Sequence, residues 1–370
     1  MAHNNCDYNN VNNEYKREDF IYKSNAPKFD RPLVTDANKM LLVFSGLFFL
    51  FQIVLMLMIA MYGPDYLNNN TYKILFINQY VIVLGTVLLY TFKKKLNVKE
   101  VFRLRWPGIK PCVLIIFMAV PAFFAAVMLN TLVIYFLQFI GNIPSQPIPV
   151  PLNFVEYIKG LLIVAVSPAI CEELMHRGII LSAYERRGTS RALIFSALFF
   201  GFFHFDVTNL LGPIFLGLMI GYYVVRTNSI FAGMLAHFLN NAISETLAFL
   251  FRHQQRPETT SIGLTELIGT VVYGSISIVI LLFLLKLFKK HTKNTAVSYT
   301  AISEISKDFK SIASHWPVII FIVLYIVMSL IFILSIAVRL QHKEFFSENK
   351  FLIIEFNHNT IVLNNYFTYA

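Results

Sequence analysis

The sequence predicts an all-α protein, a polytopic bundle of transmembrane helices, and three observations lead to that prediction. Hydrophobic residues make up 56% of the 370 residues, and charged residues only 14%. The mean hydropathy of +0.60 is higher than a water-soluble domain of this size normally reaches. The apolar residues also gather in long runs that short polar connections separate. The chain is therefore expected to be an integral, multi-pass protein of the cell membrane, in contact with the lipid bilayer.

Nine apolar runs are expected to form membrane helices. A helix needs roughly 20 residues to cross about 30 Å of hydrocarbon. The expected helices cover residues 40–62, 74–92, 112–140, 155–183, 191–205, 210–225, 230–251, 267–288 and 317–338. The fifth and sixth runs are short for a full crossing, so the predicted number of helices is about nine.

Changes in composition divide the chain into five parts. The first, 1–39, is a polar and Asn-rich tail. N-terminal transmembrane helices follow over 40–150, and a core of four helices over 151–252. Further transmembrane helices are expected over 253–340, before a C-terminal tail over 341–370.

Lysine and arginine in the connections predict the orientation of the bundle, because positive charge marks the cytoplasmic loops of membrane proteins. Basic residues cluster before residue 40, over 93–110, over 186–191, at 226 and over 289–293, which are alternate connections of the nine-helix path. The N-terminus is therefore predicted to be cytoplasmic, and the C-terminus outside. Clusters next to the membrane also account for the formal net charge of +10, so nucleic acid is not expected as a partner.

Ionisable residues inside the apolar runs mark the fourth to seventh helices as the working part. An ionisable side chain at the centre of a membrane helix costs roughly 2.5 to 3.5 kcal/mol and persists mainly where it is paired or functional. Nearly all such residues fall in these four helices: Glu172, Glu173, His176, Arg177, His204, His237 and Glu245, with Asn241 among them. With a rise of about 1.5 Å per residue, most of them lie at a similar depth. One polar site inside the bundle, near mid-membrane, is expected.

Three short motifs in this region resemble those of one family of membrane proteases. They are EELMHR at 172–177, FGFFH at 200–204 and HFLNN at 237–241. In this order, on successive membrane helices, they resemble the EExxxR, FxxxH and HxxxN motifs of the CPBP intramembrane proteases, also called the Abi or type II CAAX prenyl endopeptidase family. The resemblance covers roughly residues 155–251, about a quarter of the chain.

The resemblance implies an enzyme that hydrolyses a peptide bond within the membrane, in a peptide or a membrane-anchored protein. It assigns Glu172 with His204 to a catalytic water, and His237 with Asn241 to the tetrahedral oxyanion. Glu173 is expected to pair with Arg177 one helical turn later and to support the site. The expected catalytic set is therefore Glu172, Glu173, Arg177, His204, His237 and Asn241.

Two forms of this chemistry are compatible with the residues. Glu172, His204, His237 and Asn241 are side chains that can hold Zn²⁺ with a water in the open position. A metal-free mechanism that uses glutamate and histidine alone is equally compatible. The sequence has none of the motifs of other proteases: His-Glu-x-x-His of zinc proteases, Gly-x-Gly-Asp of intramembrane aspartyl proteases, or Gly-x-Ser-Gly of rhomboid-like serine proteases.

Other functional classes stay open at this point. Buried Glu, His and Arg also suit a proton- or solute-coupled transporter, although the two halves show no internal repeat and no paired Gly/Pro-interrupted helices. A non-proteolytic membrane scaffold or immunity protein would keep the fold without the reaction. Single residues have structural interpretations as well: an intramembrane ion pair for Glu173 with Arg177, and hydrogen-bonded packing for His176 and Glu245.

Overall fold

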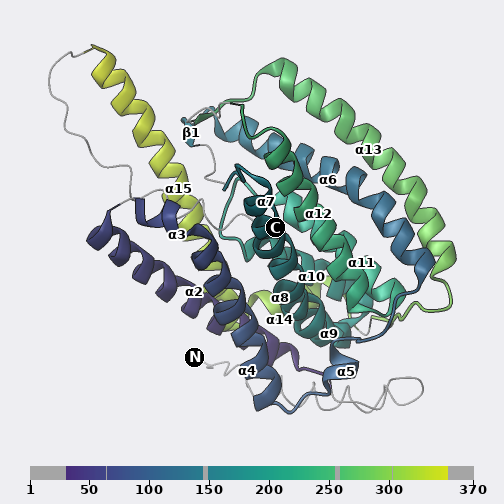
Figure 1. Cartoon of the computed structure of the whole chain (residues 1–370). Helices are drawn as coiled ribbons and strands as arrows, with labels where there is room; N and C mark the ends of the chain where they lie inside the picture. Colours follow the sequence, from purple (N-terminus) through teal and green to yellow (C-terminus); the bar gives the residue numbers. More distant parts are fainter. Residues whose placement is uncertain (1–30, 64, 145–148, 255–258, 302, 349–370) are drawn as a thin grey trace, which may run out of the picture.

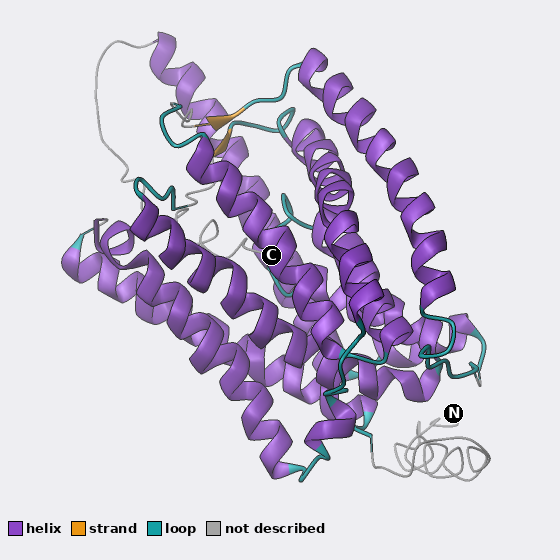
Figure 2. Cartoon of the chain, turned by 45° about the vertical axis from the view of Figure 1, so that its right-hand side comes forward, coloured by secondary structure: helices purple, strands orange, loops and turns teal. Residues whose placement is uncertain are grey.

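The computed structural model describes residues 31–63, 65–144, 149–254, 259–301 and 303–348, and helices make up nearly all the regular structure in this part of the chain (Figure 1, Figure 2). The exception is an antiparallel pair of two-residue strands, β1 (Ile143–Pro144) and β2 (Thr259–Thr260). The prediction of an all-α helical bundle is confirmed.

The first three expected helices are present, but the first begins at Val34 and the second at Asp65, both well before the expected residues 40 and 74. They are α2 (Val34–Tyr62), then a continuous helix of α3 (Asp65–Phe76), the π-helix η1 (Ile77–Leu84) and α4 (Gly85–Lys93), and, after the short α5 (Val98–Val101), α6 (Ile109–Leu137).

The fourth expected helix consists of several stretches in one continuous run. They are α7 (Phe154–Gly160), the π-helix η2 (Leu161–Val166), α8 (Ser167–Glu173), the π-helix η3 (Leu174–Ile180), α9 (Leu181–Tyr184) and the 3₁₀-helix η4 (Glu185–Arg187). Because Pro168 has no backbone N–H, it interrupts the hydrogen-bond ladder where η2 gives way to α8. π-Helical turns of this kind are frequent at functional sites.

Six helices complete the bundle: α10 (Thr189–Phe202), α11 (Leu211–Thr227), α12 (Ile230–Leu250), α13 (Leu264–His291), α14 (Ile305–Ala313) and α15 (Trp316–Glu348). The short helix α14 was not expected from the sequence. Helix α15 continues to Glu348, past residue 340, after which a tail was expected. Residues 1–30 and 349–370 of the two expected tails lie outside the described residues.

Each of the nine expected runs coincides with a helix, but only some are long and apolar enough to cross a membrane by themselves. Six helices of the described residues meet that criterion. Helices α10 and α11 are apolar but shorter, and α12 carries four buried polar residues. Since these three helices lie toward the interior of the bundle, they need not present a long apolar surface to lipid (Figure 1).

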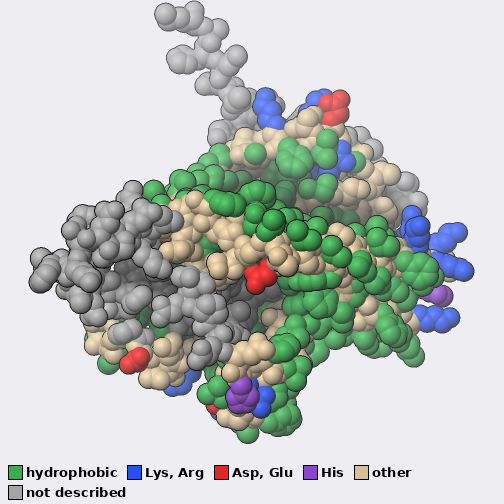
Figure 3. Space-filling model, turned by 90° about the horizontal axis from the view of Figure 1, so that it is seen from above, with side chains coloured by type: hydrophobic (Ala, Val, Ile, Leu, Met, Phe, Trp, Pro, Cys, Tyr) green, Lys and Arg blue, Asp and Glu red, His purple; other side chains and the backbone are tan. Residues whose placement is uncertain are grey.

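Flanking helices enclose the part of the bundle that holds the buried polar residues. Helices α6 and α13 pack together on one flank, and α2 packs against α15 on the other (Figure 1). Large apolar side chains stay exposed on these outer helices, Leu57, Phe117 and Phe283 among them. Seen from above, hydrophobic side chains form a broad band, with Lys and Arg in small groups toward its edges (Figure 3). So much exposed apolar surface is typical of a protein in contact with lipid.

The basic connections meet at one end of the bundle. Backbone hydrogen bonds join Ile230 N–H to the Arg103 carbonyl, Thr189 N–H to the Tyr299 carbonyl, and Val297 N–H to the Val225 carbonyl. At the same end, the buried carboxylate of Glu185 forms ion pairs with Arg31 and Arg103. The alternating path that the charge pattern indicated is therefore consistent with the fold. The membrane face to which this end belongs stays a prediction.

Cysteine labelling from outside intact cells tests that orientation. Gln254 and Asn294 are exposed polar residues beyond the two ends of α13. Because the charge pattern places residues near 254 outside, a membrane-impermeant thiol reagent is expected to label Gln254→Cys but not Asn294→Cys. Permeabilised cells, in which both variants should react, provide the control. Labelling of Asn294→Cys alone in intact cells would invert the predicted orientation.

Candidate active site

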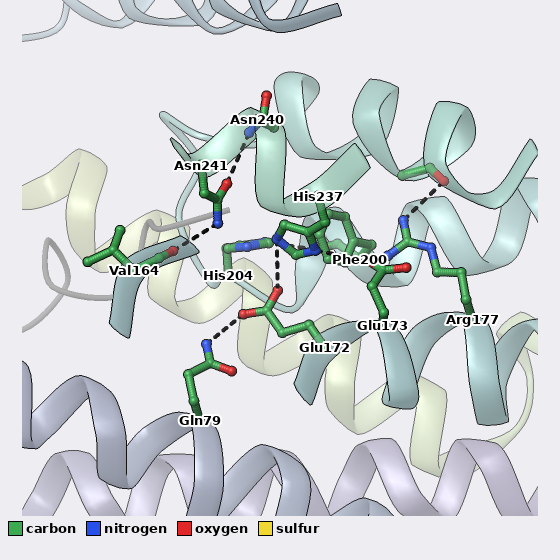
Figure 4. A network of polar contacts seen from close by, with 11 residues as sticks. Gln79, Val164, Glu172, Glu173, Arg177, Phe200, His204, His237, Asn240 and Asn241 are labelled. Atoms are coloured by element: carbon green, nitrogen blue, oxygen red, sulfur yellow. Dashed lines mark hydrogen bonds and ion pairs between the residues drawn. The ribbon is translucent and has the colours of Figure 1, made fainter. Parts of the chain in front are cut away.

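The two adjacent glutamates lie at the end of α8, and their side chains are almost fully buried. Arg177 follows in the π-helix η3, and His204 lies just beyond α10, while His237 and Asn241 lie on α12. The side chains that the sequence assigned to one site approach one another inside the bundle (Figure 4).

Glu173 is the centre of a charged network. Its Oε1 atom accepts a hydrogen bond from Arg177 Nη1 at 2.6 Å and lies 2.9 Å from His237 Nδ1. Because a carboxylate can only accept hydrogen bonds, His237 Nδ1 carries the proton in this contact. The expected ion pair between Glu173 and Arg177 is present, and Glu173 additionally fixes the imidazole of His237 (Figure 4).

Arg177 joins three elements through one guanidinium group. Its Nη2 atom donates to the Gly217 carbonyl on α11 at 3.1 Å, while its guanidinium carbon lies 4.4 Å from the ring centroid of Phe200 on α10. A planar guanidinium can form a hydrogen bond, an ion pair and an aromatic contact together, which an ammonium group cannot reproduce.

Glycines allow the backbones of α11 and α12 to approach this ion pair. A Cβ atom at position 233 would lie 2.9 Å from Glu173 Oε2, and one at position 217 would lie 3.0 Å from Ala197 Cα. Side chains at these positions would therefore push the helices apart. The small residues explain how α12 comes close enough to bring His237 to Glu173.

Glu172 points away from Glu173, as neighbouring residues on a helix do. Its Oε1 atom accepts a hydrogen bond from Gln79 Nε2 at 2.7 Å, and its Oε2 atom lies 4.0 Å from His237 Nε2. A separation of 4.0 Å is too long for a direct hydrogen bond, and it is a distance at which a bridging water is to be considered. Glu172 Oε2 and His237 Nε2 thus face each other across a short gap.

His204 is held in one tautomer by the backbone. Its Nδ1 atom lies 2.8 Å from the Phe200 carbonyl, which can only accept a hydrogen bond, so Nδ1 carries the proton. The Nε2 atom is then free to accept. The imidazoles of His204 and His237 both contact the Phe200 ring edge to face, at centroid distances of 5.3 Å and 5.7 Å.

Asn241 links α12 to the π-helix η2 by a hydrogen bond. Its Nδ2 atom donates to the Val164 carbonyl in η2 at 3.1 Å, and its Oδ1 atom accepts from Asn240 Nδ2 at 3.1 Å. One N–H bond of the Asn241 amide is therefore engaged at Val164.

Several buried polar atoms of the site have no hydrogen-bond partner among the described residues. Glu172 Oε2, His204 Nε2 and His237 Nε2 are three of them, and Gln79 Oε1, Glu173 Oε2, Arg177 Nε and Asn240 Oδ1 are others. Buried polar atoms normally have partners, and exceptions commonly mark a strained, reactive or solvent-bound position. The first three belong to the residues that the sequence assigned to the catalytic water and the oxyanion, and they leave these side chains able to form further hydrogen bonds.

His176 and Glu245 lie beside this network. The ring of His176 packs edge to face against Phe200 and Phe203, with both centroids at 5.0 Å. Glu245 lies against Gly160, where a Cβ atom would be 1.8 Å from Glu245 Oε1. His176 thus packs against Phe200 of the site, but neither of its ring nitrogens has a hydrogen-bond partner among the described residues, so the expected hydrogen-bonded packing is wrong for the His176 ring.

The four residues named for Zn²⁺ do not form a metal site as they lie. Among the described residues, no three His, Cys, Asp or Glu side chains are grouped so that they could hold a metal ion. Ligand atoms about 2.0 to 2.1 Å from a tetrahedral zinc are roughly 3.3 Å apart, whereas Glu172 Oε2 and His237 Nε2 are 4.0 Å apart. Asn241 Oδ1 already accepts from Asn240. Participation of Zn²⁺ stays a prediction.

Gln79 and Asn240 also form hydrogen bonds in the site, although the family motifs specify neither residue. Gln79 comes from the second expected helix, which was placed outside the working part. The available signal was a glutamine within a long apolar run, since a polar side chain there needs a partner. Asn240 lies directly before the last motif residue, and only the structure shows that it donates to Asn241.

The comparison with family models agrees with the motif analysis. Residues 154–243 match the family model described as type II CAAX prenyl endopeptidase Rce1-like. The match contains all three motifs, so the resemblance to the CPBP family is confirmed. The comparison with curated proteins and the comparison with solved structures gave no match.

Proposed function

We propose that this protein is an intramembrane endopeptidase that hydrolyses a peptide bond of a membrane-embedded substrate with a water activated by Glu172. The observation that carries the proposal is the pair of buried, partnerless atoms Glu172 Oε2 and His237 Nε2, which face each other at 4.0 Å. The match to a peptidase family over residues 154–243 supports the same reaction class.

The proposed reaction begins with Glu172 ionised and both nitrogens of His237 protonated. Glu172 Oε2 takes one proton from the water, and the water oxygen forms a bond to the carbonyl carbon of the substrate. His204 Nε2 accepts a hydrogen bond from the other water proton. His237 Nε2–H donates to the oxyanion that develops on the carbonyl oxygen, and the second N–H bond of the Asn241 amide is proposed as a further donor.

The tetrahedral intermediate then breaks its C–N bond. The leaving nitrogen takes the proton that Glu172 received, so the carboxylate is regenerated and the products are a carboxylic acid and an amine. Glu173 and Arg177 take no proton in this scheme. Their role is to hold His237, since Glu173 Oε1 lies 2.9 Å from His237 Nδ1 and is itself held by Arg177.

An apolar groove offers a path for a substrate from the bilayer. It has a volume of about 540 Å³ and lies between α3–η1 and α7–η2. Its lining residues are Tyr72, Lys73, Phe76, Ile77, Lys159, Leu162 and Ile163. Its walls come from the same two helices that supply Gln79 and the Val164 carbonyl to the site. This position supports a substrate whose reacting bond lies in or beside an apolar segment.

Cleavage assays with purified protein in detergent test the proposal. Wild type is expected to cut a peptide with an apolar membrane segment, a prenylated CAAX peptide, or both, whereas a transporter or scaffold would cut neither. Parallel reactions with a strong chelator, and metal analysis of the purified protein, test Zn²⁺. Full activity in chelator with no bound metal supports the metal-free scheme, and loss that added Zn²⁺ restores would contradict it.

A further inference from the structure

A glutamine from outside the family-matched segment holds the catalytic carboxylate. We propose that Gln79 is a positioning residue, which fixes Glu172 so that Oε2 faces His237. This inference rests on the proposed function, and it extends the active unit to the second membrane helix. Gln79 lies well before residues 154–243, which match the family model, and none of the three motifs includes it.

The contact is direct and buried. Gln79 Nε2 donates to Glu172 Oε1 at 2.7 Å, and only 5% of Gln79 is exposed. Burying a side-chain amide costs free energy unless it is hydrogen-bonded, and a hydrogen bond to an ionised acceptor is stronger than one between neutral groups. Since the carboxylate of Glu172 can only accept, the amide nitrogen of Gln79 is the atom that must face it.

The helix geometry brings Gln79 to this place. In the continuous helix formed by α3, η1 and α4, one row of buried residues recurs every four positions: Leu67, Thr71, Leu75, Gln79, Val83 and Val87. In a regular α-helix, with about 3.6 residues per turn, a stripe spaced at four residues would drift around the axis. The wider i→i+5 turns of η1 (Ile77–Leu84), which include Gln79, reduce that drift. The π-helix therefore keeps Gln79 on the face that packs against α8, where Glu172 lies.

Glu172 Oε2 and His237 Nε2 are then oriented in the same way, each by a hydrogen bond to the other polar atom of its own side chain. Gln79 binds the far oxygen of Glu172, and Glu173 binds the far nitrogen of His237. A carboxylate without a partner on Oε1 would rotate about its last side-chain bond and lose the alignment of Oε2 with His237 Nε2. A small misplacement of a reacting group lowers the chemical rate more than it lowers substrate binding.

Kinetics of substituted proteins separate this role from simple packing. Gln79→Met removes the donor at similar length, and Gln79→Glu keeps the shape but sets a second carboxylate beside Glu172. Both variants are expected to lower kcat by about 10 to 100-fold and to leave KM within about twofold. The control is Asn78→Leu, which removes a neighbouring buried amide that forms no hydrogen bond to Glu172. Its kcat should stay near that of wild type.

A double-mutant cycle on melting temperature tests the contact without any cleavage assay. Gln79→Met and Glu172→Leu should lower the melting temperature by less together than the sum of their separate effects, whereas Asn78→Leu and Glu172→Leu should add. Additive effects for Gln79 and Glu172 would overturn the inference, and so would an unchanged kcat in Gln79→Met. A wild-type protein that cleaves no peptide would overturn the proposed function, and the positioning role with it.

Discussion

Glu172→Gln is expected to lower peptide hydrolysis by about 10² to 10⁴-fold, the usual contribution of a positioned general base. The carboxamide has nearly the same volume as the carboxylate, and its carbonyl oxygen can still accept the hydrogen bond from Gln79 Nε2. What is lost is the basic oxygen that faces His237 Nε2. Since packing and the Gln79 contact are kept, the melting temperature should stay near that of wild type.

Initial rates on one peptide, with melting curves in the same detergent, measure this effect. The matched control is Glu304→Gln, the same chemical change at an exposed residue whose pair with Lys307 lies in solvent. This control should retain the wild-type rate. If Glu172→Gln cleaves as fast as the control, Glu172 is not the base, and the two glutamates return to a structural role.

Glu173→Gln is expected to fail differently, with a large loss of stability as well as activity. Arg177 would be left almost fully buried without its counter-charge, and breaking a buried ion pair from one side costs on the order of 3 to 5 kcal/mol. The same change weakens the bond that orients His237, because Glu173 Oε1 serves both partners. Activity should therefore fall even at temperatures where the variant is folded.

Denaturation of wild type and variant in one mild detergent measures the loss of stability. Arg177→Lys provides a second test of the same network, since one ammonium group cannot bind Glu173, the Gly217 carbonyl and the Phe200 ring as the guanidinium does. Both variants should melt below wild type. A Glu173→Gln protein as stable as Glu172→Gln would show that the ion pair with Arg177 contributes little.

The sequence was sufficient for the nine expected apolar helices, although not for the short helix α14, and for the identity of the main polar residues. Apolar runs report directly on burial in lipid, and the cost of charge in a membrane limits ionisable residues to a few places. The i,i+4 spacing of Glu173 and Arg177 similarly predicts their ion pair, because residues so spaced share a helix face.

Contacts between distant helices could not be predicted in the same way. His237 was assigned to the oxyanion with Asn241, yet its Nδ1 atom is bound to Glu173, 64 positions earlier in the chain. Gln79 and Glu172 are 93 positions apart. Such pairs depend on how helices rotate against one another, and here the π-helices η1 and η3 change that rotation locally. Apolar composition carries no signal for a π-turn.

Single-turnover cleavage in water labelled with heavy oxygen tests the central claim most directly. With excess purified wild type, the new C-terminal carboxyl group of the peptide product should carry one labelled oxygen, because the attacking oxygen comes from water that Glu172 deprotonates. Unlabelled product in this single turnover would mean that a carboxylate of the protein attacks the peptide bond and that one of its oxygens stays in the product, while the water oxygen enters the protein. That result would contradict the assignment of Glu172 as a general base.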